Sequence, residues 1–354
     1  MISKSRVDFG RPMAVGRGFG GGWSVRVDLR MVSVCALVAA AAIIVGVVTL
    51  CVGDLPIAPD RVLAAVMGDG SRMETTVVLK WRMPRVVLAL VLGALLGASG
   101  AIFQSVTRNP LGSPDVIGFN TGAYTGALVV ILLIGQKGYY ETAAGALIGG
   151  VATALAVYLL AYKRGVQGFR LIIVGIAVSA MLTSINAWIL VKADLDRAMS
   201  ASVWGAGSLN GLRWDNATPV LIVAALCVPL LVVAAVRMPI LDLGDDAAKA
   251  VGLRAEGTRL YLILVGVVLT AIATAAAGPI AFVSLAAPQI ARRLTGAPGV
   301  GLAPAAVMGA LLLVASDLVA QRAFAPTPLP VGVVTVSVGG IYLVWLLFKE
   351  GRRQ

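Results

Sequence analysis

Long apolar runs alternate with short polar connections along this chain. Ten of the runs approach the length of roughly 20 residues that crosses the hydrocarbon layer of a membrane as a helix. The run 31–53, for example, contains no charged residue. In hydrocarbon each backbone N–H must find its partner inside the segment, so these runs are predicted to be helical. The predicted spans are 31–53, 84–106, 116–135, 143–162, 171–191, 217–236, 260–277, 279–295, 301–320 and 331–348.

The division between the seventh and eighth spans is less regular than the others. A single helix from Leu260 to Leu294 would be about 52 Å long at 1.5 Å per residue, too long for a hydrocarbon core of about 30 Å. Gly278-Pro279 interrupts the run, so we divide it into two spans. Both termini are basic and are expected on the same side, which requires an even number of spans. We therefore predict ten, and one full span followed by a short re-entrant segment is the open alternative.

Composition and charge place the chain in a membrane. Hydrophobic residues make up 59% and charged residues 13% of the 354 residues. The net charge is +12, and with the N-terminus placed inside, most Lys and Arg residues fall on the inner side, which is the positive-inside pattern of a multi-pass protein of a bacterial cytoplasmic membrane. No basic patch with clustered aromatics indicates nucleic-acid binding. Residues 1–30 are basic and Gly-rich and are predicted to be a disordered cytoplasmic tail, followed by one transmembrane domain over 31–350.

Several kinds of chemistry lack the residues that they require. The chain has no histidine, which removes Ser-His catalysis and the usual zinc and haem ligand sets, so we expect no metal site and no catalytic residues. Among acidic residues we place only Asp317 near a span, whereas proton- or sodium-driven carriers usually hold acids at mid-membrane. No G-x-x-x-x-G-K-[ST] loop is present, so uphill transport would take its energy from a partner that hydrolyses ATP.

The longest inner connection, 237–259, is where such a partner would act. Its sequence RMPILDLGDDAAKAVGLRAEGTR places Leu243, Ala247, Ala250 and Val251 on one face of a helix. Gly252 stands where that helix would end. The pattern predicts a short helix that lies along the membrane and docks into a cytoplasmic ATPase. An ordinary solvated loop is the alternative.

Several sequence blocks resemble the permeases that import iron-siderophore complexes and vitamin B12 in ATP-binding-cassette (ABC) systems. The resemblance covers about residues 31–350, with the blocks in the order found in the family. The matching blocks are WRMPR at 81–85, SGAIFQSVTRNPLGSPDVIGFNTGA at 99–123, LGDDAAKAVGL at 243–253, GPIAFVSLAAPQIARRL at 278–294 and LPVGVVTVSVGGIYLVWLL at 329–347. RNPLGSPDVIGFNTGA, FRLIIVGI and GSLNGLRW are most similar to the branch that imports ferric enterobactin with two different permeases.

The resemblance implies an all-α fold of the vitamin B12 importer type, with ten helices built on an inverted repeat. It also implies a second permease subunit, two cytoplasmic ATPase subunits that use ATP and Mg, and an extracytoplasmic binding protein. This chain itself would bind no cofactor. Because the closest branch uses a distinct partner, we expect a heterodimer of permeases.

Functional residues follow from the matched blocks. The ATPase-coupling residues are Leu243, Gly244, Asp245, Asp246, Ala247, Ala250, Gly252 and Leu253. The cytoplasmic gate is expected at Asn109, Leu111, Gly168 and Phe169, although the vitamin B12 relative has small hydroxyl residues at the last two positions. Arg82, Arg85 and Arg322 would dock the binding protein, with Arg322 one place after the position of the family's third arginine. Gln104, Asn120 and Asn186 are candidates for lining the path.

Simpler roles stay open for each of these groups. The segment around Pro110 could be a plain tight turn, and Arg82 and Arg85 could anchor a span at the headgroups. Polar side chains inside spans also bond neighbouring helices. The sequence thus favours the permease subunit of a ferric-siderophore importer over a cobalamin or haem importer of the same family. A secondary carrier and an intramembrane enzyme are less favoured.

Overall fold

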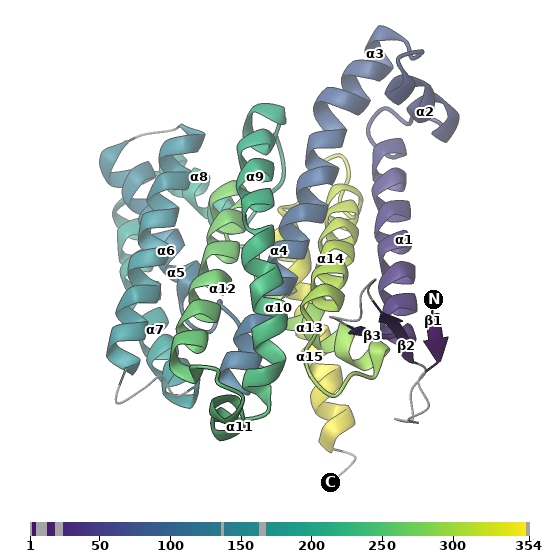
Figure 1. Cartoon of the computed structure of the whole chain (residues 1–354). Coiled ribbons are helices and arrows are strands. Elements are labelled where there is room, and N and C mark those ends of the chain that lie inside the picture. Colours follow the sequence, from purple (N-terminus) through teal and green to yellow (C-terminus); the bar gives the residue numbers. More distant parts are fainter. Residues whose placement is uncertain (1, 5–12, 18–23, 136–137, 163–167, 352–354) are drawn as a thin grey trace.

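Helices dominate the structure, a computed structural model that describes residues 2–4, 13–17, 24–135, 138–162 and 168–351. Most helices run lengthwise between two ends of the molecule (Figure 1). The short helix α11 (Asp245–Ala250) lies at one end, and α3 (Arg72–Thr75) lies at the other. These are called the α11 end and the α3 end below. The predicted all-α membrane fold is confirmed.

Most of the predicted spans correspond to a helix. The long helices are α1 (Leu29–Cys51), α4 (Met83–Thr107), α6 (Tyr139–Ala161), α7 (Gly168–Lys192), α12 (Ala255–Ala277), α14 (Leu302–Arg322) and α15 (Val331–Gly351). The α3 helix, the π-helix η1 (Thr76–Arg82) and α4 run on from one another. Within the described residues, 6 helices are long and apolar enough to cross a membrane, or 7 if the bent pair α9 (Trp214–Leu226) and α10 (Val228–Asp242) counts as one span.

The eighth predicted span is wrong as a full helix. Only Val283–Thr295 is helical (α13), and its 13 residues reach about 20 Å at 1.5 Å per residue, less than the hydrocarbon core. Residues 278–282 before it are irregular because Gly278 and Phe282 both adopt positive φ, at 74° and 69°, and Pro279 lacks a backbone donor. The segment is therefore an irregular stretch followed by a half-length helix.

Two other spans are less regular than predicted. The third begins with irregular backbone up to Gly118, and its helical part is α5 (Phe119–Leu128) continued by the π-helix η2 (Val129–Ile134). The sixth bends by 40° between α9 and α10, where Pro229 at the start of α10 cannot donate a backbone hydrogen bond. Both departures occur at Gly and Pro residues, whose effect on backbone geometry a hydropathy profile does not describe.

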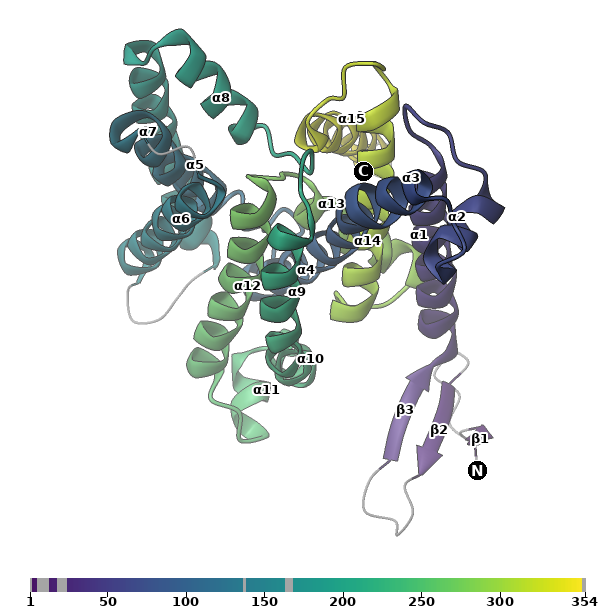
Figure 2. The same cartoon turned by 90° about the horizontal axis from the view of Figure 1, so that it is seen from above.

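The core is built around α4, most of whose residues are buried. It packs against α12, α13 and α14, whereas α5, α6 and α7 form a group on one side and α1 lies on the other (Figure 2). Gly93 and Gly97 let α4 approach α14 closely, since a Cβ at either position would overlap the α14 backbone near Gly309 or Ala305. Small residues four apart are a common means of close helix packing in membranes.

At the α3 end and beside the N-terminus lie smaller elements. Helix α2 (Pro59–Met67) starts at a proline and stops at Gly68, and α8 (Leu195–Gly205) follows α7. The described residues of the N-terminal tail form a three-stranded antiparallel sheet of β1 (Ile2–Lys4), β2 (Met13–Arg17) and β3 (Ser24–Asp28). Val15, for example, pairs with Arg26. The rest of the tail, residues 1, 5–12 and 18–23, lies outside the described residues, and the disorder expected for the tail stays a prediction.

Candidate functional site

The connection 237–259 contains the short helix that its amphipathic pattern predicts. Gly244, with φ of 108°, precedes α11, and Gly252, with φ of 82°, follows it. Glycine adopts such conformations without the steric cost that other residues bear. Leu243, Ala247, Ala250 and Val251, the predicted apolar face, are all exposed. Apolar side chains exposed at the end of a bundle provide a surface on which a partner can pack.

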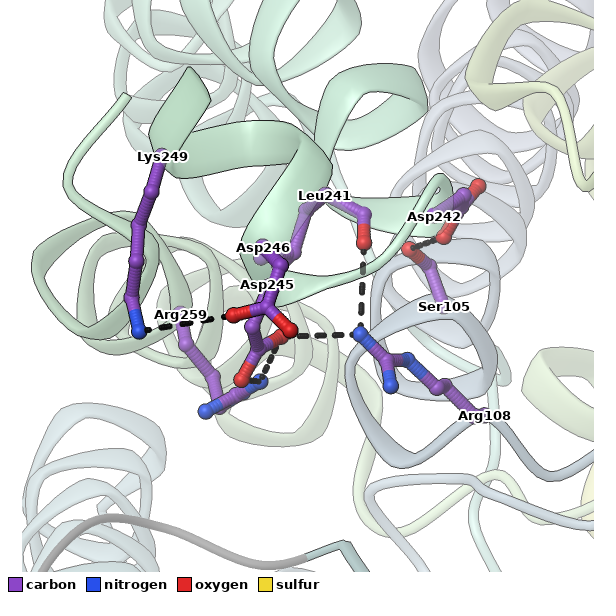
Figure 3. A network of polar contacts seen from close by, with 8 residues as sticks. All are labelled: Ser105, Arg108, Leu241, Asp242, Asp245, Asp246, Lys249 and Arg259. Atoms are coloured by element: carbon purple, nitrogen blue, oxygen red, sulfur yellow. Dashed lines mark hydrogen bonds and ion pairs between the residues drawn. The ribbon is translucent and has the colours of Figure 1, made fainter. Parts of the chain in front are cut away.

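An ion-pair network at Asp245 fastens α11 to the bundle (Figure 3). Arg108, at the end of α4, donates to Asp245 Oδ1 over 2.8 Å, and Arg259 of α12 donates to both carboxylate oxygens over 2.9 and 3.2 Å. Burial alone raises the pKa of Asp245, but the hydrogen bond and charge of Arg259 and the charge of Arg108 lower it below its usual range. Asp246 is fully exposed and lies 3.9 Å from Lys249.

The proposed gate residues lie in two segments that touch. Asn109 forms a tight turn: its Oδ1 accepts from the Leu111 backbone over 2.9 Å, and its carbonyl accepts from Gly112 over 2.9 Å. Gly168, at the start of α7, packs on the end of α4 so closely that a Cβ would lie 2.6 Å from Thr107 backbone atoms. Leu111 is 50% and Phe169 is 76% exposed. Two large apolar side chains therefore project from neighbouring helix ends.

The three candidate path residues are not all in one place. Asn120 of α5 and Asn186 of α7 line a cavity of about 350 Å³ together with residues such as Tyr124 and Pro279. The Oδ1 of Asn186 is buried without a hydrogen-bond partner among the described residues. Gln104 instead donates to the Leu285 carbonyl over 3.0 Å and accepts from Gln289 over 2.6 Å, which joins α4 to α13.

Asp115 is a polar residue that sequence reasoning missed. Its carboxylate accepts from Ser284 over 3.0 Å and from Asn120, and Asn120 accepts from Thr274 of α12 over 3.1 Å. The irregular stretch before α5 is therefore hydrogen-bonded to the first turn of α13. Asp115 borders a predicted span, and its position after Pro114 was the available signal for irregular backbone at that depth.

The three docking candidates meet at the α3 end, but they differ in environment. Arg82 donates over 2.7 Å to the carbonyl of Leu50, in the last turn of α1, and over 2.6 Å to that of Leu55, beyond the end of α1. Arg85 forms an ion pair with the buried Asp317 of α14 at 2.8 Å. The Arg322 Nε is buried without a hydrogen-bond partner among the described residues. The three line a cavity of about 290 Å³ that also includes Trp81 and Gln321.

No group of three or more His, Cys, Asp or Glu side chains that could hold a metal occurs in the part of the chain that the structure describes. The polar clusters found there are single carboxylates with arginine, amide or hydroxyl partners. Such clusters bind and orient groups, and they hold helices together.

Comparisons with known proteins give a consistent result. A sequence model of the FecCD transport family matches residues 40–349. The ferric enterobactin transport system permease protein FepG of Escherichia coli is 51% identical over 93% of this chain and 100% of its own. The probable siderophore transport system permease protein YfhA of Bacillus subtilis is 36% identical over 84% of this chain and 89% of its own. In three dimensions the chain resembles a metal-chelate type ABC transporter in an inward-facing conformation, with a TM-score of 0.78, 25% identity and coverage of 90% of this chain and 99% of that one.

Proposed function

The chain belongs to the FecCD transport family of iron-chelate permeases, and from this membership we propose that it carries a ferric siderophore across the bacterial cytoplasmic membrane. The match over 100% of a ferric enterobactin permease is the observation that supports this cargo most directly. The cargo class is an iron(III) chelate of the enterobactin type or a related siderophore. Cobalamin and haem are the alternatives that an uptake assay separates.

A partner supplies the energy. We propose that two ATPase subunits bind ATP and Mg and dock on α11, whose apolar face is exposed. The coupling surface comprises Leu243, Gly244, Asp245, Asp246, Ala247, Ala250, Gly252 and Leu253. The α11 end then faces the cytoplasm together with both termini, in keeping with the basic residues of the inner connections. The gate of Asn109, Leu111, Gly168 and Phe169 would lie on the same side.

The α3 end would face the binding protein. Arg85 already pairs with Asp317, so we assign the electrostatic contact to Arg82 and Arg322. Arg82 donates to backbone carbonyls, and the Arg322 Nε is buried without a hydrogen-bond partner among the described residues. Carboxylates on the binding protein would meet these guanidinium groups, as interfaces with complementary charge do. Arg85 would hold α4 and α14 in place beneath that surface.

The central path would form against a second, different permease. Asn120 and Asn186 line a cavity between α5 and α7 that supplies polar groups to such a path. A permease that receives its cargo from a high-affinity binding protein does not itself need a high-affinity site. Polar groups without charge would let the cargo pass.

Uptake of radiolabelled iron tests the function. A deletion strain with and without this gene is supplied with iron complexed to enterobactin, to a hydroxamate siderophore and to citrate, with labelled cobalamin and haem as alternatives. Uptake of a catecholate complex that depends on the gene supports the proposal. Gene-dependent uptake of cobalamin or haem alone would instead identify that compound as the cargo.

A further inference from the structure

Arg108 occupies a backbone position where glycine would be expected. It ends α4 with φ of 49°, and among the described residues only Arg108 and Phe282 adopt positive φ without being glycine. Helices commonly end on a left-handed residue, which is usually glycine because a Cβ is disfavoured there. The contacts of the Arg108 side chain therefore explain why an arginine occupies this position.

The Arg108 guanidinium reaches both the coupling helix α11 and the helix before it, α10 (Figure 3). Its Nη2 donates to Asp245 Oδ1, in the first turn of α11, over 2.8 Å and to the Leu241 carbonyl of α10 over 3.5 Å. One turn earlier on α4, Ser105 donates to Asp242 over 2.5 Å. The cytoplasmic end of α4 is thus bound to the coupling loop at three points.

The backbone of Arg108 leads directly into the gate. The next residue, Asn109, closes the turn that presents Leu111, and the Pro110 carbonyl in that turn accepts from Gln289 over 3.2 Å. Hydrogen bonds at the base of this turn leave it little freedom to deform independently of Arg108. Gly168 packs on Thr107, the residue before Arg108, so the other half of the gate rests on the same helix end.

A second arginine on Asp245 serves as a natural comparison. Arg259 pairs with the same carboxylate and is 11% exposed, but it belongs to the first turns of α12 and forms no hydrogen bond or ion pair with the gate turn in the described part of the chain. Both arginines hold α11, and only Arg108 also continues into the gate. The two therefore have different expected roles.

We propose that Arg108 is a positioning residue that transmits movement of the ATPase-docking helix to the cytoplasmic gate. This inference rests on the proposed function, in which α11 docks the ATPase. When the ATPase displaces α11, the Asp245–Arg108 pair moves the end of α4, and the turn bearing Leu111 moves with it. Loss of the pair leaves ATP hydrolysis running while the gate no longer follows.

The test compares Arg108→Gln, Arg108→Lys and Arg259→Gln in the complete importer reconstituted in vesicles with its ATPase and loaded binding protein. The readout is ATP hydrolysed per iron complex imported. For Arg108→Gln, hydrolysis stays close to wild type and import falls about tenfold, a size typical of coupling between two sites. Arg108→Lys keeps the charge and recovers much of the import. Arg259→Gln loosens α11 and lowers hydrolysis and import in the same proportion.

Three outcomes overturn the inference. They are import and hydrolysis in Arg108→Gln that both stay at the wild-type level, a proportional fall of both activities in that variant, and its failure to assemble with the ATPase. The last two would give Arg108 only a structural role. The wild-type complex is measured first. If it imports no ferric siderophore, the proposed function fails, and the ratio is then measured with the cargo that it does import.

Discussion

Arg85 of α4 and Asp317 of α14 form a two-point ion pair between residues 232 positions apart in the sequence. The Arg85 Nε and Nη2 donate to the carboxylate over 2.9 and 2.8 Å, and Gln321 donates to the same group over 2.8 Å. The Asp317 side chain is fully buried and that of Arg85 is 16% exposed. The pair joins α4 and α14, which pack against each other in the core, and Arg85 also lines the cavity at the α3 end.

Removing one member of this pair should destabilise the protein more than removing both. Arg85→Leu or Asp317→Leu alone leaves a buried charge without its partner, which costs about 3–5 kcal/mol. The double variant replaces the pair with apolar groups and should recover most of that loss. Unfolding in detergent, followed for the two single variants and the double variant, measures the difference. A double variant as unstable as the singles would show that the two residues act separately.

A charge reversal at Arg322 should weaken capture of the loaded binding protein without affecting insertion. Like charges at an interface oppose association, and we expect a loss of at least about tenfold, or roughly 1.4 kcal/mol. Capture on vesicles with matched amounts of protein measures the loss, and added salt should weaken the wild-type encounter through screening. Arg72→Glu is the control, since Arg72 is exposed at the same end and does not line the cavity.

If Arg85 has only the internal role assigned here, the double variant Arg85→Leu/Asp317→Leu should capture the binding protein normally. Normal capture by Arg322→Glu would remove that residue from the docking surface. Reduced capture by the double variant would show that Arg85 belongs to the docking surface.

Hydropathy predicted the helices but not the pairs between them. An apolar run such as α1 can be predicted as a helix from its own sequence, since its length matches the membrane and a helix satisfies its backbone hydrogen bonds internally. The bond between Arg85 and Asp317 depends on which helices become neighbours, and no local pattern encodes a separation of 232 residues. The family resemblance identified Arg85 as a functional candidate, but it implied a partner on the binding protein and not within this chain.

Irregular backbone inside the bundle was the other limit. Gly278-Pro279 indicated a break, yet the length of α13 could not be read from the sequence, because residues 278–282 do not form a helix although most of them belong to the predicted span. Such backbone survives at that depth only when protein groups satisfy it. The Asp115 carboxylate, which accepts a hydrogen bond from the Phe282 backbone, is one of those groups, and it comes from a segment far away in the sequence.

Reversal of Asp245 and Asp246 together should abolish uptake while leaving insertion intact, and the structure assigns the larger share to Asp245. Asp245→Lys would place three cations together at Arg108 and Arg259. Asp246→Lys disturbs only an exposed contact with Lys249, and such pairs contribute little. Uptake is measured for the two single variants and the double variant at equal membrane levels, and the loss in each single variant gives the contribution of that residue. Normal uptake by the double variant would exclude the loop from coupling.

The chain should be recovered from its native membrane together with a second permease of similar size. Blocks such as RNPLGSPDVIGFNTGA led us to expect a heterodimer of permeases, in which each subunit would present its own face to the cargo. Purification of the tagged protein followed by mass spectrometry identifies the partner. Recovery of this chain and an ATPase in equal amounts, without another permease, would instead indicate a homodimer.

Gly168→Ser should impair import by displacing the gate. A Cβ at this position would lie 2.6 Å from the Cα and carbonyl oxygen of Thr107, so α7 would have to move away from the end of α4 and carry Phe169 with it. The obstacle is backbone, so trimming the neighbour with Thr107→Ala should not restore import. We expect import to fall several-fold while ATP hydrolysis continues.

Gly257→Ser is the matched control for this variant. Gly257 lies at the start of α12 near the same end of the molecule, and the nearest atom to its Cβ would be 3.9 Å away, so the same substitution fits. Import by the two variants is compared in vesicles at equal protein. If Gly168→Ser imports as well as Gly257→Ser, the close contact with Thr107 does not set the position of the gate. A structure of Gly168→Ser would then show whether α7 has moved away from α4 to make room for the added Cβ.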